Sequence, residues 1–218
     1  MNDGALEPLS RVSWADPTSI VSLLPDALRI IADSRPTLSE YVLDSERVEK
    51  YPNFYKVVLR EFATGVSMRL HFFPSPAVGS RHSHRWVFGS HVIAGRLIHN
   101  IYEEDTVYER REEGEEPLVM TRSEIPGGSY VLWPSNVHSI EVVEPSLTLV
   151  LRGPAVREQR FVHVPGVERG WSRRYNRPDL IPAGVDASPN ERATIVKSVL
   201  EILRGSDPQM RKELGRPE

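Results

Sequence analysis

The sequence predicts an all-β core, a barrel or sandwich, with helices before it and one helix after it. Residues 52–165 contain short runs of β-forming residues that are separated by turns rich in glycine and proline. Residues 17–50 and 189–203 instead carry apolar residues at three- and four-residue spacings, which indicate helices. We therefore expect a helical N-terminal extension over 1–51, a β barrel over 52–165, and an irregular segment with a C-terminal helix over 166–218 that packs on the barrel.

The expected elements follow in chain order. Pro17 and Thr18 can open a helix, and Pro25 should divide it into two short ones; residues 38–48 are a further helical candidate. Strands are expected at 56–62, 67–73, 87–94, 96–102, 130–133 and 147–151. The charge-rich run 103–116 should be an exposed hairpin tip, and 167–188 should be irregular, with Trp171, Arg173, Arg174 and Tyr175 suited to a lid over an anion.

Composition excludes several classes of function. The 218 residues include no cysteine, so disulfides and thiolate ligands are impossible and a metal must bind His, Asp or Glu. The formal charge of −3 gives no general attraction to nucleic acid or to an anionic membrane. No apolar run approaches the roughly 20 residues that span a bilayer, and the N-terminus lacks the pattern of a signal peptide. We expect a cytoplasmic protein with neither nucleic acid nor membrane as a partner.

Two histidine motifs are the strongest functional signal. His82 and His84 lie at i and i+2 of an extended segment, so their side chains should point to the same side. His138, in the turn and strand that follow Pro134, can supply a third imidazole from a distant part of the chain. Three neutral imidazoles on one face suit a divalent metal and leave coordination positions for a substrate. We predict that His82, His84 and His138 are metal ligands.

These motifs resemble those of the cupin superfamily. The pattern His82-x-His84-x3-Phe88-x6-Gly95 is similar to the first cupin motif, and Gly128-x5-Pro134-x3-His138 is similar to the second. The resemblance covers about residues 56–152. It implies a double-stranded β-helix, or jelly-roll barrel, and it is weak for function because one fold hosts many reactions.

One departure from the cupin pattern bears on the chemistry. Phe88 occupies the position where the first cupin motif usually has a glutamate ligand. This leaves either a three-histidine site or a weakened one, and we favour the first. The resemblance is then to the three-histidine cupins of the cysteine dioxygenase type, although a cysteine–tyrosine crosslink is impossible in this chain. Iron(II) is the first choice because it activates dioxygen, and nickel, manganese, copper or zinc are the alternatives.

A metal with three neutral ligands keeps its full charge and therefore favours an anionic substrate. The leading hypothesis is a metal-dependent oxygenase that acts on a small anionic organic molecule, with dioxygen as co-substrate. The alternatives are a non-redox isomerase or lyase and a non-catalytic small-ligand-binding cupin. The resemblance also admits a homodimer.

Further candidate site residues fall into two groups. The candidates for proton handling are Tyr130 and His71, which with Ser90 are also candidates to orient the metal ligands. The candidates for substrate binding are the cations and aromatic residues near the motifs: Lys56, Arg60, Arg69, Trp86, Phe88, Trp133 and Arg152. His91, His99 and His163 are expected to be structural. Strand alternation places Glu141 on the face opposite His138.

Overall fold

The computed structural model describes residues 6–104, 118–158, 162 and 184–205. Its helices are α1 (Glu7–Ser10), α2 (Pro17–Asp33), α3 (Arg35–Leu43) and α5 (Pro189–Gly205). The first strands are β1 (Arg47–Lys50), β2 (Tyr55–Glu61), β3 (Ser67–Phe73), β4 (Ala77–Val78), β5 (Trp86–Ala94) and β6 (Leu97–Glu104). The remaining strands are β7 (Leu118–Glu124), β8 (Ser129–Leu132), β9 (Asn136–Val142), β10 (Ser146–Ala155) and β11 (Val185–Asp186).

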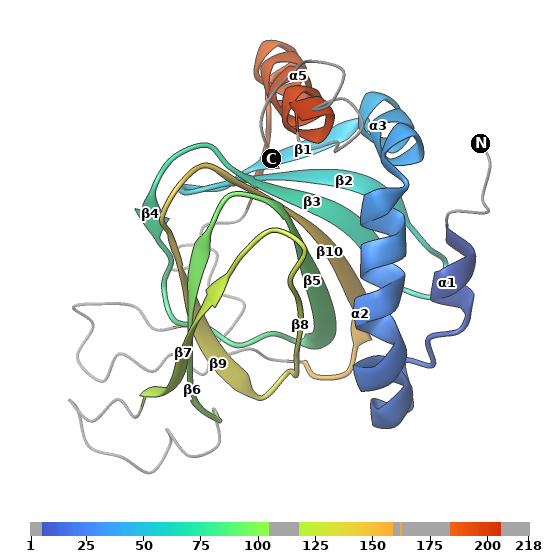
Figure 1. The fold of residues 1–218 in the computed structure, drawn as a ribbon, viewed down its shortest axis with the longest axis vertical. Coiled ribbons are helices and arrows are strands. Elements are labelled where there is room, and N and C mark those ends of the chain that lie inside the picture. The colour runs from blue at the N-terminus through green and yellow to red at the C-terminus, as the bar shows by residue number, and fades with distance from the viewer. Residues whose placement is uncertain (1–5, 105–117, 159–161, 163–183, 206–218) are drawn as a thin grey trace.

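The strands form two antiparallel sheets that face each other as a barrel (Figure 1). The larger sheet has the order β11-β1-β2-β3-β10-β5-β8, and the smaller sheet has the order β4-β9-β6-β7. Between β3 and β10 the chain passes repeatedly from one sheet to the other, as in a jelly roll. The predicted fold, an all-β jelly-roll core with N-terminal helices and a C-terminal helix, is therefore confirmed.

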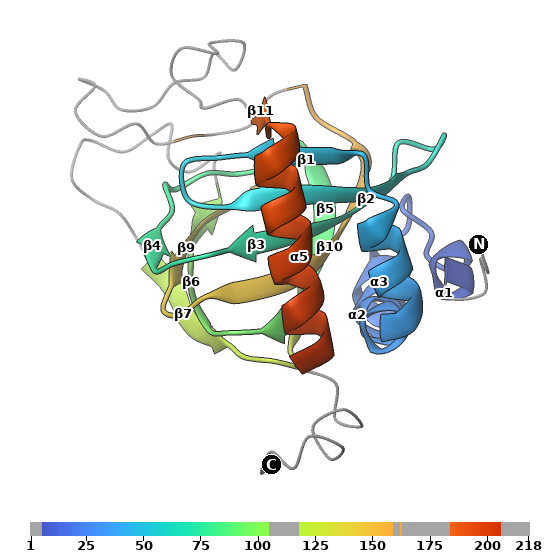
Figure 2. The same cartoon turned by 90° about the horizontal axis from the view of Figure 1, so that it is seen from above.

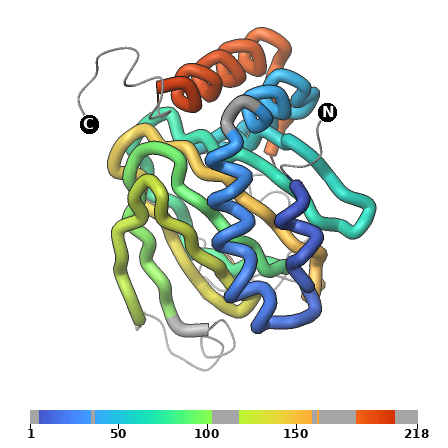
Figure 3. The backbone as a smooth tube through the Cα atoms, turned by 45° about the vertical axis from the view of Figure 1, so that its right-hand side comes forward, coloured from blue at the N-terminus to red at the C-terminus, as the bar shows by residue number. Residues whose placement is uncertain are grey.

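The helices cover the outer face of the larger sheet (Figures 2 and 3). Residues at alternate positions of β3 and β10, such as Leu70 and Leu149, point to this face and are fully buried against helical residues such as Leu28 of α2 and Val199 of α5. Alternation then turns the neighbouring residues of the same strands toward the smaller sheet. The helices thus complete a core on one face and leave the inner face of the sheet for the site.

The N-terminal region differs from the prediction in two places. Pro25 does not divide the first helix, because α2 continues through it. The carbonyl that loses its hydrogen bond belongs to Val21, four residues earlier, and Val21 is 58% exposed, so water can satisfy that group. Residues 47–50 form strand β1 where helix was expected. Val48 of this strand is buried in the core beneath the helices, and β1 pairs with both β2 and β11.

Several predictions fall on residues that the structure does not describe. These are residues 105–116 of the charge-rich run at 103–116, the candidate lid residues Trp171, Arg173, Arg174 and Tyr175, and His163. Within the described ranges, every helix is too short or too polar to cross a bilayer.

Candidate metal centre

The two histidine motifs meet through their backbones. The N–H of His82 donates to the carbonyl of His138, and the N–H of His138 donates to the carbonyl of His82, both at 2.9 Å. His82 and His84 lie between β4 and β5, and His138 lies on β9. The three side chains each present a nitrogen, and these nitrogens lie within 4.8 Å of one another. The structure therefore brings together the three residues that the sequence predicted as ligands.

Hydrogen bonds orient two of these rings. Nδ1 of His82 lies 2.9 Å from the carbonyl oxygen of Ser80, which can only accept, so the ring donates from Nδ1 and keeps a bare Nε2. Nδ1 of His138 lies 3.0 Å from Nε2 of His99, whose Nδ1 lies 3.0 Å from Oε1 of Glu124. The carboxylate accepts from Nδ1 of His99, and Nε2 of His99 then accepts from Nδ1 of His138. This order leaves Nε2 of His138 bare as well.

Burial keeps His138 in the form that binds metal. The ring is 2% exposed. Desolvation, followed by the nearby His82 and His84, holds the pKa of His138 well below its usual value. The imidazole is therefore neutral at pH 7, as a metal ligand must be.

The residues present fit a divalent metal. Nε2 of His84 lies 2.8 Å from Nε2 of His138, close to the roughly 3.0–3.4 Å between neighbouring ligands on an ion with bonds of about 2.1 Å. Three imidazoles without a carboxylate form a donor set that zinc, copper, nickel and iron all accept.

Phe88 closes one side of this centre. Its side chain is 7% exposed, and its ring centroid lies 4.5 Å from that of His84 and 6.1 Å from that of His138. It packs with Tyr130, Leu132 and Val150 in a small apolar cluster. An apolar ring therefore stands where a cupin glutamate would add negative charge, and it excludes water from that side of the site.

The three histidines open into a cavity of about 450 Å³ between the sheets, within the usual range for small-molecule sites. Most of the predicted site residues line it: Lys56, Arg69, His71, Trp86, Phe88, Tyr130 and Arg152. Apolar side chains such as Phe54, Leu97 and Val162 complete the wall.

The structure does not bring Arg60 and Trp133 to this cavity. A β-bulge between Val58 and Arg60 reverses the alternation of β2, so Arg60 pairs with Met68, which points to the helix-covered face. Trp133 follows β8 and packs on the same helix-covered core. The prediction that these two residues contact substrate is corrected accordingly.

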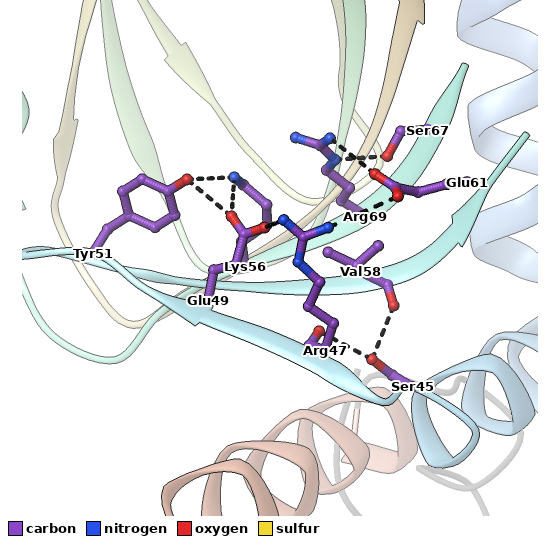
Figure 4. A network of polar contacts seen from close by, with 9 residues as sticks. All are labelled: Ser45, Arg47, Glu49, Tyr51, Lys56, Val58, Glu61, Ser67 and Arg69. Carbon is purple, nitrogen blue, oxygen red and sulfur yellow. Dashed lines mark hydrogen bonds and ion pairs between the residues drawn. The ribbon is translucent and has the colours of Figure 1, made fainter. Parts of the chain in front are cut away.

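Lys56 belongs to a polar network at one side of the cavity (Figure 4). Its Nζ lies 2.6 Å from Oε2 of Glu49 and 2.5 Å from the hydroxyl of Tyr51, which also lies 2.9 Å from that carboxylate. Burial lowers the pKa of Lys56 although Glu49 opposes this effect. Burial raises the pKa of Glu49, but the hydrogen bond and charge of Lys56 outweigh it and hold that pKa below its usual value.

The two arginines of the cavity are less fully paired. Arg69 donates from Nε to the hydroxyl of Ser67 at 2.7 Å, and its nearest carboxylate, on Glu61, lies 3.8 Å away. Burial and then the charge of Arg152 lower the pKa of Arg69 to about 10, so it stays charged at pH 7. Arg152 stacks on Trp86, with Cζ 4.6 Å from the ring centroid.

Tyr130 and His71 line the cavity in opposite protonation roles. Burial raises the pKa of Tyr130 to about 12, so its hydroxyl keeps its proton. Burial, followed by the charges of Lys56 and Arg69, holds the pKa of His71 well below its usual value, so this ring is neutral. Tyr130 can therefore donate a proton or hydrogen bond to a bound molecule, and His71 can accept one.

His99 is the functional residue that sequence reasoning missed. It was expected to be structural, yet it is fully buried and contacts His138 directly. In the register of β6 with β9, His99 pairs with Ile140, and Ile101 pairs with His138, so both histidines share one face. The signal was the alternation Leu97, His99, Ile101, which marks an inward-facing histidine once the pairing is known.

His91, expected to be structural, and Glu141, expected on the face opposite His138, both lie outside the cavity. His91 hydrogen-bonds Ser129 at 2.7 Å and does not line the cavity. Glu141 is exposed, away from the metal centre.

Comparisons with known proteins give likeness at the level of solved structures. No family model matches the chain, and no curated protein does. KdgF from Halomonas sp. is 21% identical, with a TM-score of 0.37 over 49% of this chain and 86% of that one. An RmlC-like cupin from Shewanella frigidimarina is 18% identical, with a TM-score of 0.40 over 52% and 87%.

The DMSP lyase DddQ from Ruegeria pomeroyi is also similar, at 14% identity and a TM-score of 0.40 over 58% of this chain and 60% of that one. These likenesses extend over about half of the present chain. The description of this chain as a jelly-roll barrel that holds two cupin-like histidine motifs in one cavity rests on its own strand order and residues.

Proposed function

We propose that this protein is a metal-dependent cupin oxygenase that acts on a small anionic organic substrate. The observation that carries the proposal is the convergence of three imidazoles, from His82, His84 and His138, in a cavity that also contains cations. Iron(II), when bound, would supply open coordination positions and the ability to activate dioxygen.

The remaining residues of the cavity would bind and position the substrate. Arg69 and Arg152 offer positive charge on the inner face of the larger sheet, where a low dielectric strengthens attraction to an anion. Phe88 and Trp86 exclude water beside the histidines and hold the apolar part of the substrate. The hydroxyl of Tyr130, protonated at pH 7, would donate to an oxygen of the substrate.

A non-redox isomerase or lyase is the second candidate. The observation that favours it is the presence of a proton donor, Tyr130, and a neutral acceptor, His71, on the wall of one cavity. Such a pair can move a proton on a substrate whose carbonyl a metal polarises. Oxygen consumption separates this candidate from the first.

The test begins with metal content. The protein is purified anaerobically, and wild type, His84→Ala and His91→Ala are compared by elemental analysis; His91→Ala removes a buried histidine outside the cavity and serves as the matched control. We expect about one iron per chain in wild type and the control, and loss of iron in His84→Ala. Oxygen uptake is then measured with small carboxylates, thiols and diketones.

The outcomes separate the three hypotheses. Iron with substrate-dependent oxygen uptake supports the oxygenase. Stoichiometric zinc, nickel or manganese with turnover but without oxygen uptake favours the isomerase or lyase. Absence of bound metal under every loading condition contradicts both enzymes and leaves a small-ligand-binding protein.

A further inference from the structure

Three cations lie along a diagonal on the inner face of the larger sheet. Lys56 on β2 pairs with His71 on β3, and Arg69 lies two residues before His71 on the same face. Arg69 pairs with Val150 on β10, and Arg152 lies two residues after Val150, again on the same face. Diagonal neighbours of this kind are within reach of long side chains. All three cations line the cavity.

These cations exceed the carboxylates that contact them. Glu49 lies 2.6 Å from Lys56, and the half-exposed Glu61 lies 3.8 Å from Arg69, but both carboxylates are also ion-paired to Arg47 outside the cavity. No ion pair to Arg152 occurs in the described part of the chain, and its Nε is buried without a hydrogen-bond partner there. Because Arg47 shares both carboxylates, the cavity cations are incompletely neutralised, and the Arg69–Arg152 end keeps an excess of positive charge. A buried donor without a partner is costly, so this end is suited to an acceptor that arrives with a ligand.

The Arg69–Arg152 end of the cavity lies about the length of one small molecule from the histidines. Cζ of Arg152 lies 4.6 Å from the centroid of the Trp86 ring, and the centroid of the His84 ring lies 6.1 Å from the same point. The guanidinium and the His84 ring are therefore at most about 11 Å apart. Arg152 also pairs across the strands with Phe88, whose ring contacts His84. An aromatic surface thus connects the two polar ends of the cavity.

We propose that the ligand is a bifunctional monocarboxylic acid. Its carboxylate would lie between Arg69 and Arg152, its apolar or aromatic body against Trp86 and Phe88, and its second polar group at the histidine centre. The excess positive charge at this end attracts an anion, and a planar guanidinium held against an aromatic ring can offer two parallel N–H groups to the two oxygens of one carboxylate. The proposal deepens the proposed function and rests on it for the metal-binding end of the ligand alone.

The carboxylate end can be tested without metal. Binding of 3-phenylpropionate, its neutral amide and inorganic phosphate to chelator-treated protein is measured by calorimetry. The variants are Arg152→Gln, Arg152→Lys and Arg96→Gln; Arg96 is exposed outside the cavity, which makes it the matched control. We expect the acid to bind at least about ten-fold more tightly than the amide, since a charge-assisted hydrogen bond is lost with the amide. Arg152→Gln should abolish this preference, Arg152→Lys should retain part of it, and Arg96→Gln should leave it unchanged.

Each contrary result overturns a defined statement. Equal binding of acid and amide by wild type, which requires no variant, contradicts the carboxylate subsite. Tighter binding of phosphate contradicts the assignment to a monocarboxylate. Metal binding without acid binding removes this proposal and leaves the proposed function intact. Acid binding in a protein that takes up no metal does the reverse, because it supports the Arg69–Arg152 subsite and contradicts the oxygenase.

Discussion

Removing the charge of Glu124 should weaken metal binding at a site that Glu124 does not touch. Glu124 is 5% exposed and accepts from Nδ1 of His99, and His99 in turn holds Nδ1 of His138. Changes to such supporting hydrogen bonds typically cost about 10- to 100-fold in metal affinity. Glu124→Gln keeps an acceptor but loses the charge, so we expect the lower end, about ten-fold, or about 1.4 kcal/mol. His99→Leu leaves the buried N–H of His138 without its acceptor, so we expect about 100-fold.

The assay is competitive titration of chelator-treated protein with a divalent metal and a chromophoric chelator. Glu141→Gln is the matched control, because Glu141 is an exposed residue of β9, three positions from His138, and carries the same change away from the site. Thermal unfolding of each metal-free variant verifies that the protein is folded at the assay temperature.

The expected order of affinity is wild type equal to Glu141→Gln, then Glu124→Gln, then His99→Leu. If Glu124→Gln and His99→Leu bind metal as tightly as Glu141→Gln does, the hydrogen-bond chain does not orient His138, and the reasoning fails. If metal affinity falls in His99→Leu but not in Glu124→Gln, the hydrogen bond between His99 and His138 supports metal binding and the one between Glu124 and His99 does not.

Three further outcomes follow from the packing and charges of the barrel. Phe88→Glu should tighten metal binding by about ten-fold or more relative to Phe88→Gln, measured by the same titration, because it adds a negative charge beside the ligands; equal affinities would show that residue 88 does not reach the metal. Gly89→Ala should cost about 1–3 kcal/mol in chemical denaturation, since its Cβ would lie 2.7–2.8 Å from leucine side chains of α2, whereas Gly205→Ala, with open space, should cost far less. Glu49→Gln should cost about 1.5–3 kcal/mol at pH 7 by leaving Lys56 without its carboxylate. The lowered pKa of Glu49 means that wild type has this stabilisation above pH 4.5 and loses it as the pH falls, so the two melting temperatures should converge in acid; a constant gap from pH 7 to 3 would contradict the pairing.

The fold and the three histidine ligands could be predicted because both follow from the spacing of residue types along short stretches of the sequence. Alternation puts His82 and His84 on one side, and the second motif marks the strand that brings His138. His99 could not be found in the same way, since its contact with His138 depends on the register of β6 with β9, which no local pattern of either strand determines. Register is a property of the paired strands.

The errors at Arg60 and Pro25 have related origins. Parity along β2 would place Arg60 with Lys56, but one bulge reverses the alternation. Pro25 was expected to end a helix, and its cost is low here because the carbonyl it leaves unbonded is on the exposed side of α2. In both cases the outcome depends on what surrounds the residue in space.

The reciprocal backbone hydrogen bonds between His82 and His138 have a consequence for metal exchange. They join the two motifs through the main chain, so contacts that involve no ion hold the ligands near one another. We therefore expect the protein to fold before it takes up metal, unlike small domains that fold only on metal. The ion should leave and return on a rigid frame, and the amide protons of His82 and His138 should exchange slowly with solvent in the chelator-treated protein as well.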